Sequence, residues 1–328
     1  AKQGRAATND LAKRVEELFA KDAGISHYYN KVLAGGKWNH MMDQTHISYT
    51  NWQQPEKDVL PKVDKIEVPA AADMGVSIGG SDKWWPAEAT EAVLPEFDPF
   101  NQQKYYVEVF NRGRTPFRYE IESGEAWLRV TPSRGELDLE QRISVSVDWQ
   151  HAPNGTHRVP ITVVGPNGNR IVVQAVINNP ALSERNRVRG FVESNGHISI
   201  EAEHYTRAVS ADPLEWLHIP NLGRTLSGIT PIPVTAKSQS PGGDSPRLEY
   251  ALHLWSHGKI SVNVYVSPTQ NFHDTQGLRY GLSFDNEEPQ IINIHEKDTV
   301  PDWKYPPVWS QAVGENIKVT TSEHLLQE

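Results

Sequence analysis

The sequence predicts a mainly β protein, in which a short helical lead-in is followed by an immunoglobulin-like β-sandwich and then by a jelly-roll-like β-sandwich. Three observations predict this order. The first residues carry an apolar stripe with helical spacing, two later regions alternate apolar and polar residues, and a polar linker at 181–190 separates those regions. A chain of 328 residues is also longer than one core usually supports.

The helical lead-in covers 1–62 and reads as the tail of a helical domain. Leu11, Val15, Leu18 and Phe19 recur at i, i+4, i+7 and i+8. We expect Thr8 or Asn9 to cap this helix, Gly24 to interrupt it, and a second helix to run from Ser26 to Gly35-Gly36. Two helices bury little, so we expect the bundle and a catalytic barrel to begin upstream. Residues 37–62 are dense in aromatic, His, Met and amide side chains without periodicity.

A mixed connector of short strands is expected over 63–97, and the immunoglobulin-like sandwich over 98–180. Strict alternation marks its strands, for example at 105–109, 143–149 and 171–177. Turn sequences rich in Gly, Pro and Asn separate these strands.

The jelly-roll-like domain is expected over 191–328. Its predicted strands include GHISIEAEHY, SPRLEYALHLW, GKISVNVYVSP, LRYGLSFD and QIINIHE, with long loops at 211–247 and 297–311. The last strand is expected around Ile317–Val319, with no closing strand after it, so we expect this domain to be truncated.

Composition excludes several classes of function. The net charge is −9, and Lys and Arg do not cluster, which argues against a nucleic-acid partner. There is no cysteine, hence no disulfide, thiolate metal site or cysteine nucleophile. No apolar run is long enough to cross a membrane. Nucleophile elbows, P-loops and dinucleotide fingerprints are absent.

Three histidine and aspartate residues, His40, Asp43 and His46, form the first candidate site. On a helix His40 and Asp43 would share a face, whereas His46 would fall off it. The spacing does not match a zinc-binding helix. A polar network that braces two elements is one interpretation, and a wall that faces substrate is the other.

Two carboxylates, Glu201 and Glu203, form the second candidate site. On a strand they would lie on one face, about 6.7 Å apart. Two residues of one strand cannot easily flank a glycosidic bond from both sides, so a pair of catalytic carboxylates is disfavoured. Structural calcium is the functional interpretation, because Ca²⁺ prefers carboxylate oxygens. Solvated surface carboxylates are the alternative.

An aromatic stretch, DWKYPPVW, carries Trp303, Tyr305 and Trp309 on a chain stiffened by prolines. Such a flat edge suits stacking on sugars or docking of a second subunit. The alternative is a loop that packs over the end of the sandwich and has no binding role.

The segment GGKWNHMMDQTHISYTNWQQP (35–55) resembles the stretch that follows the barrel and helical bundle in glycoside hydrolase family 115. FVESNGHISIEAEHYTR, HIPNLGRTLSGITPIPVTA and WSQAVGENIKV resemble the C-terminal β-domain of that family. The resemblance implies a xylan α-1,2-glucuronidase, which removes 4-O-methylglucuronic acid from glucuronoxylan with inversion. It places the acid and the base in the upstream barrel, so no catalytic residue is assigned to this chain. IEAEHY also resembles the first strand of calcium-binding jelly-roll modules.

The resemblance implies an accessory role, in which the chain braces the barrel, helps to form a homodimer and lends loops to the substrate groove. His40, Asp43, Trp52, Trp303, Tyr305 and Trp309 are the candidates for contact with glucuronoxylan, xylo-oligosaccharides or a second subunit. No cofactor is required beyond possible calcium, and a secreted or periplasmic bacterial location is expected. A xylan-binding module and a purely structural spacer remain the alternatives.

Overall fold

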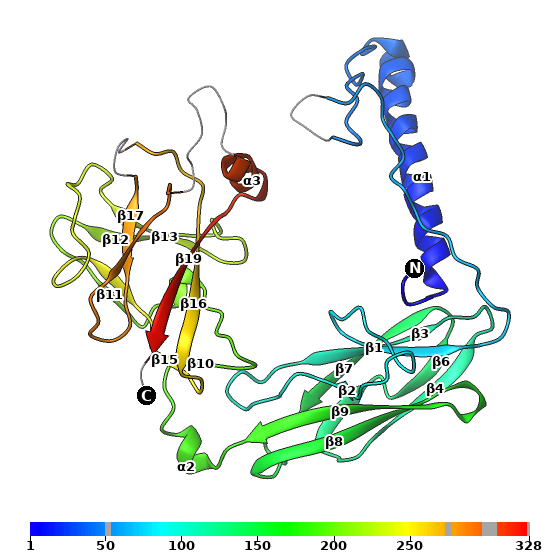
Figure 1. Ribbon diagram of the computed structural model, residues 1–328. Coiled ribbons are helices and arrows are strands. Elements are labelled where there is room, and N and C mark those ends of the chain that lie inside the picture. Colours follow the sequence, from blue (N-terminus) through cyan, green and yellow to red (C-terminus); the bar gives the residue numbers. More distant parts are fainter. Residues whose placement is uncertain (50–53, 273–276, 297–306, 327–328) are drawn as a thin grey trace. The chain divides into compact units, whose positions relative to one another are not determined.

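The computed structural model describes residues 1–49, 54–272, 277–296 and 307–326 (Figure 1). The chain divides into two compact units, Ala1–Ala181 and Leu182–Glu328. Sheets dominate both units, and the predicted mainly β fold class is confirmed.

The first unit opens with one long helix, α1 (Ala7–His27), drawn in blue in Figure 1. It continues into a π-helical turn, η1 (Tyr28–Val32), and a 3₁₀ turn, η2 (Leu33–Gly36). The expected interruption at Gly24 is wrong, because a single Gly costs a helix only about 1 kcal/mol and does not end it. The expected cap is also wrong: the residue before the helix is Ala6, without a side-chain cap, and Asn9 instead bonds to the backbone of Ile66.

A β-sandwich follows the helix, with two antiparallel sheets that form its layers (Figure 1). The four-stranded sheet has the order β1 (Met74–Ile78), β3 (Tyr105–Asn111), β7 (Glu140–Val147) and β5 (Leu128–Thr131). The five-stranded sheet has the order β2 (Ala92–Val93), β9 (Arg170–Asn179), β8 (Gly155–Val164), β4 (Phe117–Ser123) and β6 (Arg134–Leu137), in which only β2 pairs in parallel with its neighbour β9. A 3₁₀ turn, η3 (Pro166–Gly168), joins β8 to β9.

Period-2 alternation builds the core of the sandwich. Every second residue of β9 is buried, from Ile171 to Ile177, and β7 repeats this with Ile143 and Val145. Side chains of one face therefore point between the two sheets, where they meet Phe97, which has no exposed surface. The residues of 63–97 also belong here, because β1 extends one sheet and β2 the other.

The start of the chain is fastened to this sandwich by Arg5. Its guanidinium donates to Glu108 at 2.7 Å, to Glu140 at 2.9 Å and to the hydroxyl of Ser77 at 2.9 Å. The same group lies 4.3 Å from the centre of the Phe110 ring. Partial burial opposes ionisation of Glu108, but the hydrogen bonds and charges of Arg5 and Arg142 outweigh it and lower the pKa of Glu108.

The second unit contains five two-stranded sheets among its described residues. Its pairs are β10 (Phe191–Val192) with β15 (Leu252–His253), β11 (Arg207–Val209) with β14 (Arg247–Glu249), β12 (Glu215–Ile219) with β13 (Gly228–Ile232), β16 (Gly258–Val266) with β19 (Lys318–Leu326), and β17 (Arg279–Leu282) with β18 (Gln290–Asn293). Helices α2 (Leu182–Arg185) and α3 (Pro307–Glu315) and the 3₁₀ turn η4 (Ala202–His204) complete the unit.

Three expectations for this unit are corrected. Residues 196–205 do not form a strand, because their backbone turns into η4. The long loop at 211–247 contains the hairpin β12–β13. The strand expected around Ile317–Val319 is longer than expected: β19 runs from Lys318 to Leu326 and pairs with β16 over nine residues. The three differences share one cause: pairing with a partner strand, rather than local alternation of apolar and polar residues, decides whether a segment forms a strand.

We expect Arg5→Ala to lower the free energy of unfolding of the first unit by about 1–3 kcal/mol, because Glu108 would keep its partial burial and lose its main partner. Chemical denaturation followed by tryptophan fluorescence measures this. Arg158→Ala, which breaks the exposed pair with Glu91, is the control and should change stability by less than about 0.5 kcal/mol. Equal effects of the two substitutions would contradict the role of Arg5.

Candidate functional site

The loop that follows α1 is positioned by a buried amide. Asn30, in the π-helical turn, is only 6% exposed. Its Nδ2 donates to Asp43 Oδ1 at 2.8 Å, and its Oδ1 accepts the backbone N–H of Met42 at 2.9 Å. The extra residue of a π-turn changes where the following side chains point, and such turns are frequent at functional sites. Asn30 therefore fixes the backbone and the carboxylate of an otherwise exposed loop.

The structure brings two of the predicted residues together in this loop. His40 Nδ1 makes a short hydrogen bond with Asp43 Oδ2, and both side chains are more than half exposed. The pairing arises in a turn rather than a helix: the N–H of Met41 donates to the carbonyl of Trp38 at 3.1 Å. His40 has a φ of +71°, in the left-handed region.

His46, the third predicted residue, has other partners. Its Nε2 lies 3.0 Å from an Asp22 carboxylate oxygen on α1, and its Nδ1 bonds to the carbonyl of Gln44 at 3.0 Å. The bond to Gln44, followed by the bond to Asp22, raises the pKa of His46. Asp58 accepts the backbone N–H groups of Ile47 and His46, which lowers the pKa of Asp58. His46 thus braces the loop against the helix.

Apolar side chains on this braced loop are exposed. Trp38, Met41, Met42 and Tyr49 are between 38% and 66% exposed. The loop is therefore held by polar groups underneath and presents aromatic and thioether groups outward. A surface of this kind is suited to binding rather than to packing within the unit. Trp52, the remaining candidate of this segment, lies outside the described residues.

Glu201 and Glu203 lie at the start of and inside η4 rather than on one strand face. Glu201 accepts a short hydrogen bond from Thr225, and Glu203 accepts one from His218 at 2.9 Å. A bond from Ser227 and then the bond from His218 lower the pKa of Glu203. Among the described residues, no group of three or more His, Cys, Asp or Glu is arranged to hold a metal ion. Both carboxylates bond to protein donors, and the expected calcium site at Glu201 and Glu203 stays a prediction.

The turn of Glu203 is held in place by the β11–β14 pair. Glu249 accepts bonds from Arg207 at 2.7 and 2.8 Å and from Arg247 at 2.7 Å. Next to it, the Tyr250 hydroxyl donates to the carbonyl of Ala202 at 2.8 Å. The Arg207 bonds, followed by that of Arg247, lower the pKa of Glu249 to about 2. Glu249 thus links β11 to β14, and Tyr250 ties the η4 turn to this pair.

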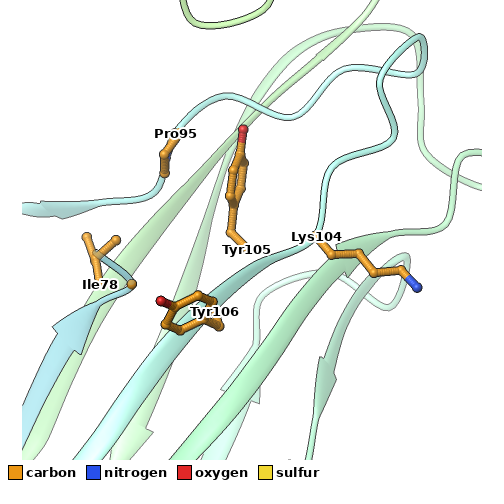
Figure 2. Close-up of a pocket in the computed structure, with 6 residues that line it drawn as sticks. Ile78, Pro95, Lys104, Tyr105 and Tyr106 are labelled. Carbon is orange, nitrogen blue, oxygen red and sulfur yellow. The ribbon is translucent and has the colours of Figure 1, made fainter. Parts of the chain in front are cut away.

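Two features went unnoticed in the sequence. Glu193, 6% exposed, accepts the N–H groups of Trp255 and Ser256 at 2.7 and 2.8 Å and pins the segment after β15. In the first unit, a small pocket of about 70 Å³ lies beside Tyr106 (Figure 2). It is lined by Ile78, Gly79, Pro95, Lys104, Tyr105 and Tyr106. No short sequence pattern signals either feature, because both join segments that are distant in the chain.

The pocket beside Tyr106 is a packing feature rather than a candidate site. A side chain at Gly79 would meet the Tyr106 ring at 2.4 Å, so the ring lies directly on the backbone there. The Arg142 guanidinium covers the ring from 4.1 Å. The space that remains is smaller than a typical ligand site of several hundred Å³.

Two candidates of the aromatic stretch, Trp303 and Tyr305, lie outside the described residues. Trp309 falls in α3, and its side chain is also outside the described part. Their contact with sugar or with a second subunit stays a prediction.

A family model matches most of the second unit. Residues 190–328 match the model of the glycosyl hydrolase family 115 C-terminal domain. This match supports a family 115 C-terminal region in this part of the chain, and it corresponds to the β-domain for which the sequence resemblance was noted. No curated protein sequence matches the chain. None of the helices described is long and apolar enough to cross a membrane.

Solved structures share only a weak likeness with the chain. A GH5 xyloglucanase from Bacteroides ovatus has 14% identity and a TM-score of 0.23, over 33% of this chain and 19% of the xyloglucanase. A PapD-like domain of human CEP192 has 15% identity and a TM-score of 0.25, over 39% of this chain and 99% of that domain. The E. coli chaperone DraB has 15% identity and a TM-score of 0.25, over 39% and 68%. Likeness at this level carries no functional argument.

The pKa of Glu249 gives the second unit a defined pH dependence. The unfolded state, with an ordinary Glu pKa of 4.5, takes up its proton before the folded state does at about 2. The stabilisation from this carboxylate is therefore complete above pH 4.5 and is lost as the pH falls towards 2. In a thermal-unfolding series, Glu249→Gln should lower the midpoint at pH 7 and approach the wild type near pH 2. A constant gap across this range would contradict the assignment.

Proposed function

We propose that this chain is the C-terminal accessory region of a xylan α-1,2-(4-O-methyl)glucuronidase, which removes glucuronic acid branches from glucuronoxylan by inverting hydrolysis. The observation that carries the proposal is the match of residues 190–328 to the family 115 C-terminal domain. In this role the chain supports the catalytic barrel, contributes to a homodimer and shapes access of glucuronoxylan to the barrel. The enzyme acts outside the cytoplasm, as a secreted or periplasmic bacterial protein.

The pKa values of the carboxylates support a non-catalytic role for this chain. Inverting glycosidases hold an acid and a base about 6.5–9.5 Å apart on opposite sides of the bond that they cleave. Six carboxylates have lowered pKa values and accept hydrogen bonds from protein donors: Asp58, Glu108, Asp148, Glu193, Glu203 and Glu249. A general acid needs the reverse, a carboxyl with a raised pKa. These carboxylates of the chain are structural.

The exposed face of α1 supports attachment to a larger body. Leu11, Leu18 and Ile25 follow one another at seven-residue intervals along α1 and are between 46% and 64% exposed. Seven residues nearly complete two helical turns, so these side chains form one stripe. The opposite side of the helix is occupied by its own chain, through Asn9 to Ile66 and Glu16 to Lys65. A continuous apolar stripe of this length is typical of a helix that packs on another helix.

The activity itself is tested by release of glucuronic acid from glucuronoxylan. We expect the chain alone to release none, and the enzyme that contains both the barrel and this chain to be active. Removing residues 190–328 from that enzyme should reduce its thermal stability and its activity together. Release of glucuronic acid by the chain alone, or an enzyme unaffected by the removal, would overturn the proposal.

The stripe gives a second prediction. Replacing Leu11, Leu18 and Ile25 together by Gln should change the stability of the chain alone by less than about 1 kcal/mol, because these side chains are already exposed. In the enzyme with the barrel, the same change should cost several kcal/mol by exposing a packed interface, since each buried Leu or Ile contributes about 1.5–3 kcal/mol. Differential scanning calorimetry of both forms measures this.

The matched control for the stripe lies on the same helix. Lys13, Ala20 and His27 have the same seven-residue spacing and are exposed, although they lie on the side of the helix that also carries Asn9 and Glu16. Their replacement by Gln should leave both forms unchanged. If the stripe and control variants behaved alike in the enzyme, the stripe would not be an interface.

A further inference from the structure

The turn after α1 places a histidine where the backbone favours glycine. The carbonyl of Trp38 accepts the N–H of Met41, which makes His40 the third residue of a four-residue turn. A φ of +71° at this position is easiest for Gly and costs other residues about 1–3 kcal/mol, although Asn, Asp and His are enriched among the residues that adopt it. Glycine would close this turn at a lower cost in conformational free energy, so the presence of the imidazole needs another explanation.

The bond to Asp43 determines which ring nitrogen carries the proton. A carboxylate can only accept, so Nδ1 of His40 donates to Asp43. In the neutral ring, Nε2 is then a hydrogen-bond acceptor. The side chain of His40 is 73% exposed, and Nε2 has no partner among the described residues. Asp43 is held in turn by buried Asn30. The acceptor is therefore oriented before any ligand arrives.

An aromatic ring and a cation lie in the same turn. The indole of Trp38 is 38% exposed, and the ammonium of Lys37 lies 4.8 Å from the centre of that ring. A flat aromatic group suits the apolar face of a pyranose ring, an ammonium pairs with a carboxylate, and an imidazole acceptor takes a hydroxyl. These three groups recognise different parts of one kind of molecule, a sugar that carries an acid.

We propose that the 37–43 turn is a binding site for an acidic saccharide. Trp38 stacks on the sugar ring, Lys37 pairs with the carboxylate, and Nε2 of His40 accepts a hydrogen bond from a sugar hydroxyl. Asp43 and Asn30 are positioning residues, because they act through His40. That the saccharide is the glucuronic acid branch of xylan rests on the function proposed above. The site itself rests on the geometry of the turn.

In the experiment, the 328-residue chain is titrated with xylotetraose that carries one glucuronic acid branch, and isothermal titration calorimetry measures the affinity. Unbranched xylotetraose should bind about tenfold more weakly, because it has no carboxylate for Lys37. Trigalacturonate, an acidic saccharide unrelated to xylan, is the third probe. If trigalacturonate alone binds, the site stands and its assignment to glucuronoxylan fails.

His40→Gly separates binding from folding. We expect affinity for the branched probe to fall about tenfold, while the unfolding midpoint stays equal or rises, because the left-handed strain is relieved. His40→Asn, which also tolerates this backbone, should behave likewise and guards against a misfolded glycine variant. A loss of stability with unchanged affinity would show that His40 is a brace and would overturn the site.

The chain contains a matched control. His151 Nδ1 lies 3.0 Å from Asp148, three residues away, and its side chain is 72% exposed. Trp149 lies in the same turn, but it packs against the core of the sandwich, and no lysine flanks this pair. His151→Gly should leave the affinity unchanged. Absence of binding of all three probes to the wild type would overturn the site, whereas the proposed function would still be decided by glucuronic acid release from the enzyme with its barrel.

Discussion

The position of α1 depends on the guanidinium of Arg5. The helix has little core of its own: Ala7 and Ala12 are its buried apolar residues, and its larger apolar side chains at 11, 18 and 25 are exposed. Arg5 binds two carboxylates, one hydroxyl and one aromatic ring of the sandwich, immediately before the helix begins. The next residue continues this attachment, because the N–H of Ala6 donates to the carbonyl of Asn111 at 2.8 Å. The start of the helix is therefore fastened to the sandwich by Arg5 and by the backbone of Ala6.

The two units hold their shape by different means. In the first unit a continuous apolar cluster fills the space between two sheets. In the described part of the second unit, the buried apolar residues are Val192, Leu214 and Ala312. Carboxylates with several donors reinforce its small sheets instead: Glu193 beside the β10–β15 pair, Glu249 within the β11–β14 pair, and Glu203 between η4 and β12. Apolar burial responds weakly to pH, whereas ionised carboxylates lose their bonds when protonated. Acid should therefore act first on the second unit.

Local alternation determined how much of the fold was predictable. Strands β3, β7, β9 and β16 each have one apolar and one polar face, and the sequence shows this directly. Apolar and polar residues also alternate around Glu201 and Glu203. There, however, Thr225 and His218 bond to these carboxylates, and the backbone turns instead of forming a strand. The spacing of His40 and Asp43 predicted a pair only on a helix, whereas the pair forms in a turn. Asn30 was not predictable, because its bonds depend on a π-turn and on a residue with positive φ.

The turn of His40 combines several features that lower the stability of the fold and that folding alone does not require. Its backbone is in the left-handed region, its apolar neighbours Met41 and Trp38 are exposed, and a buried amide is committed to holding Asp43. Each feature lowers the stability of an isolated chain or adds nothing to it. Together these features hold the imidazole acceptor of His40 beside the aromatic face of Trp38. A loop that only connected the helix to the sandwich would not require either group to be held in place. Strain that is compensated by such exact support is the physical signature of preorganised recognition.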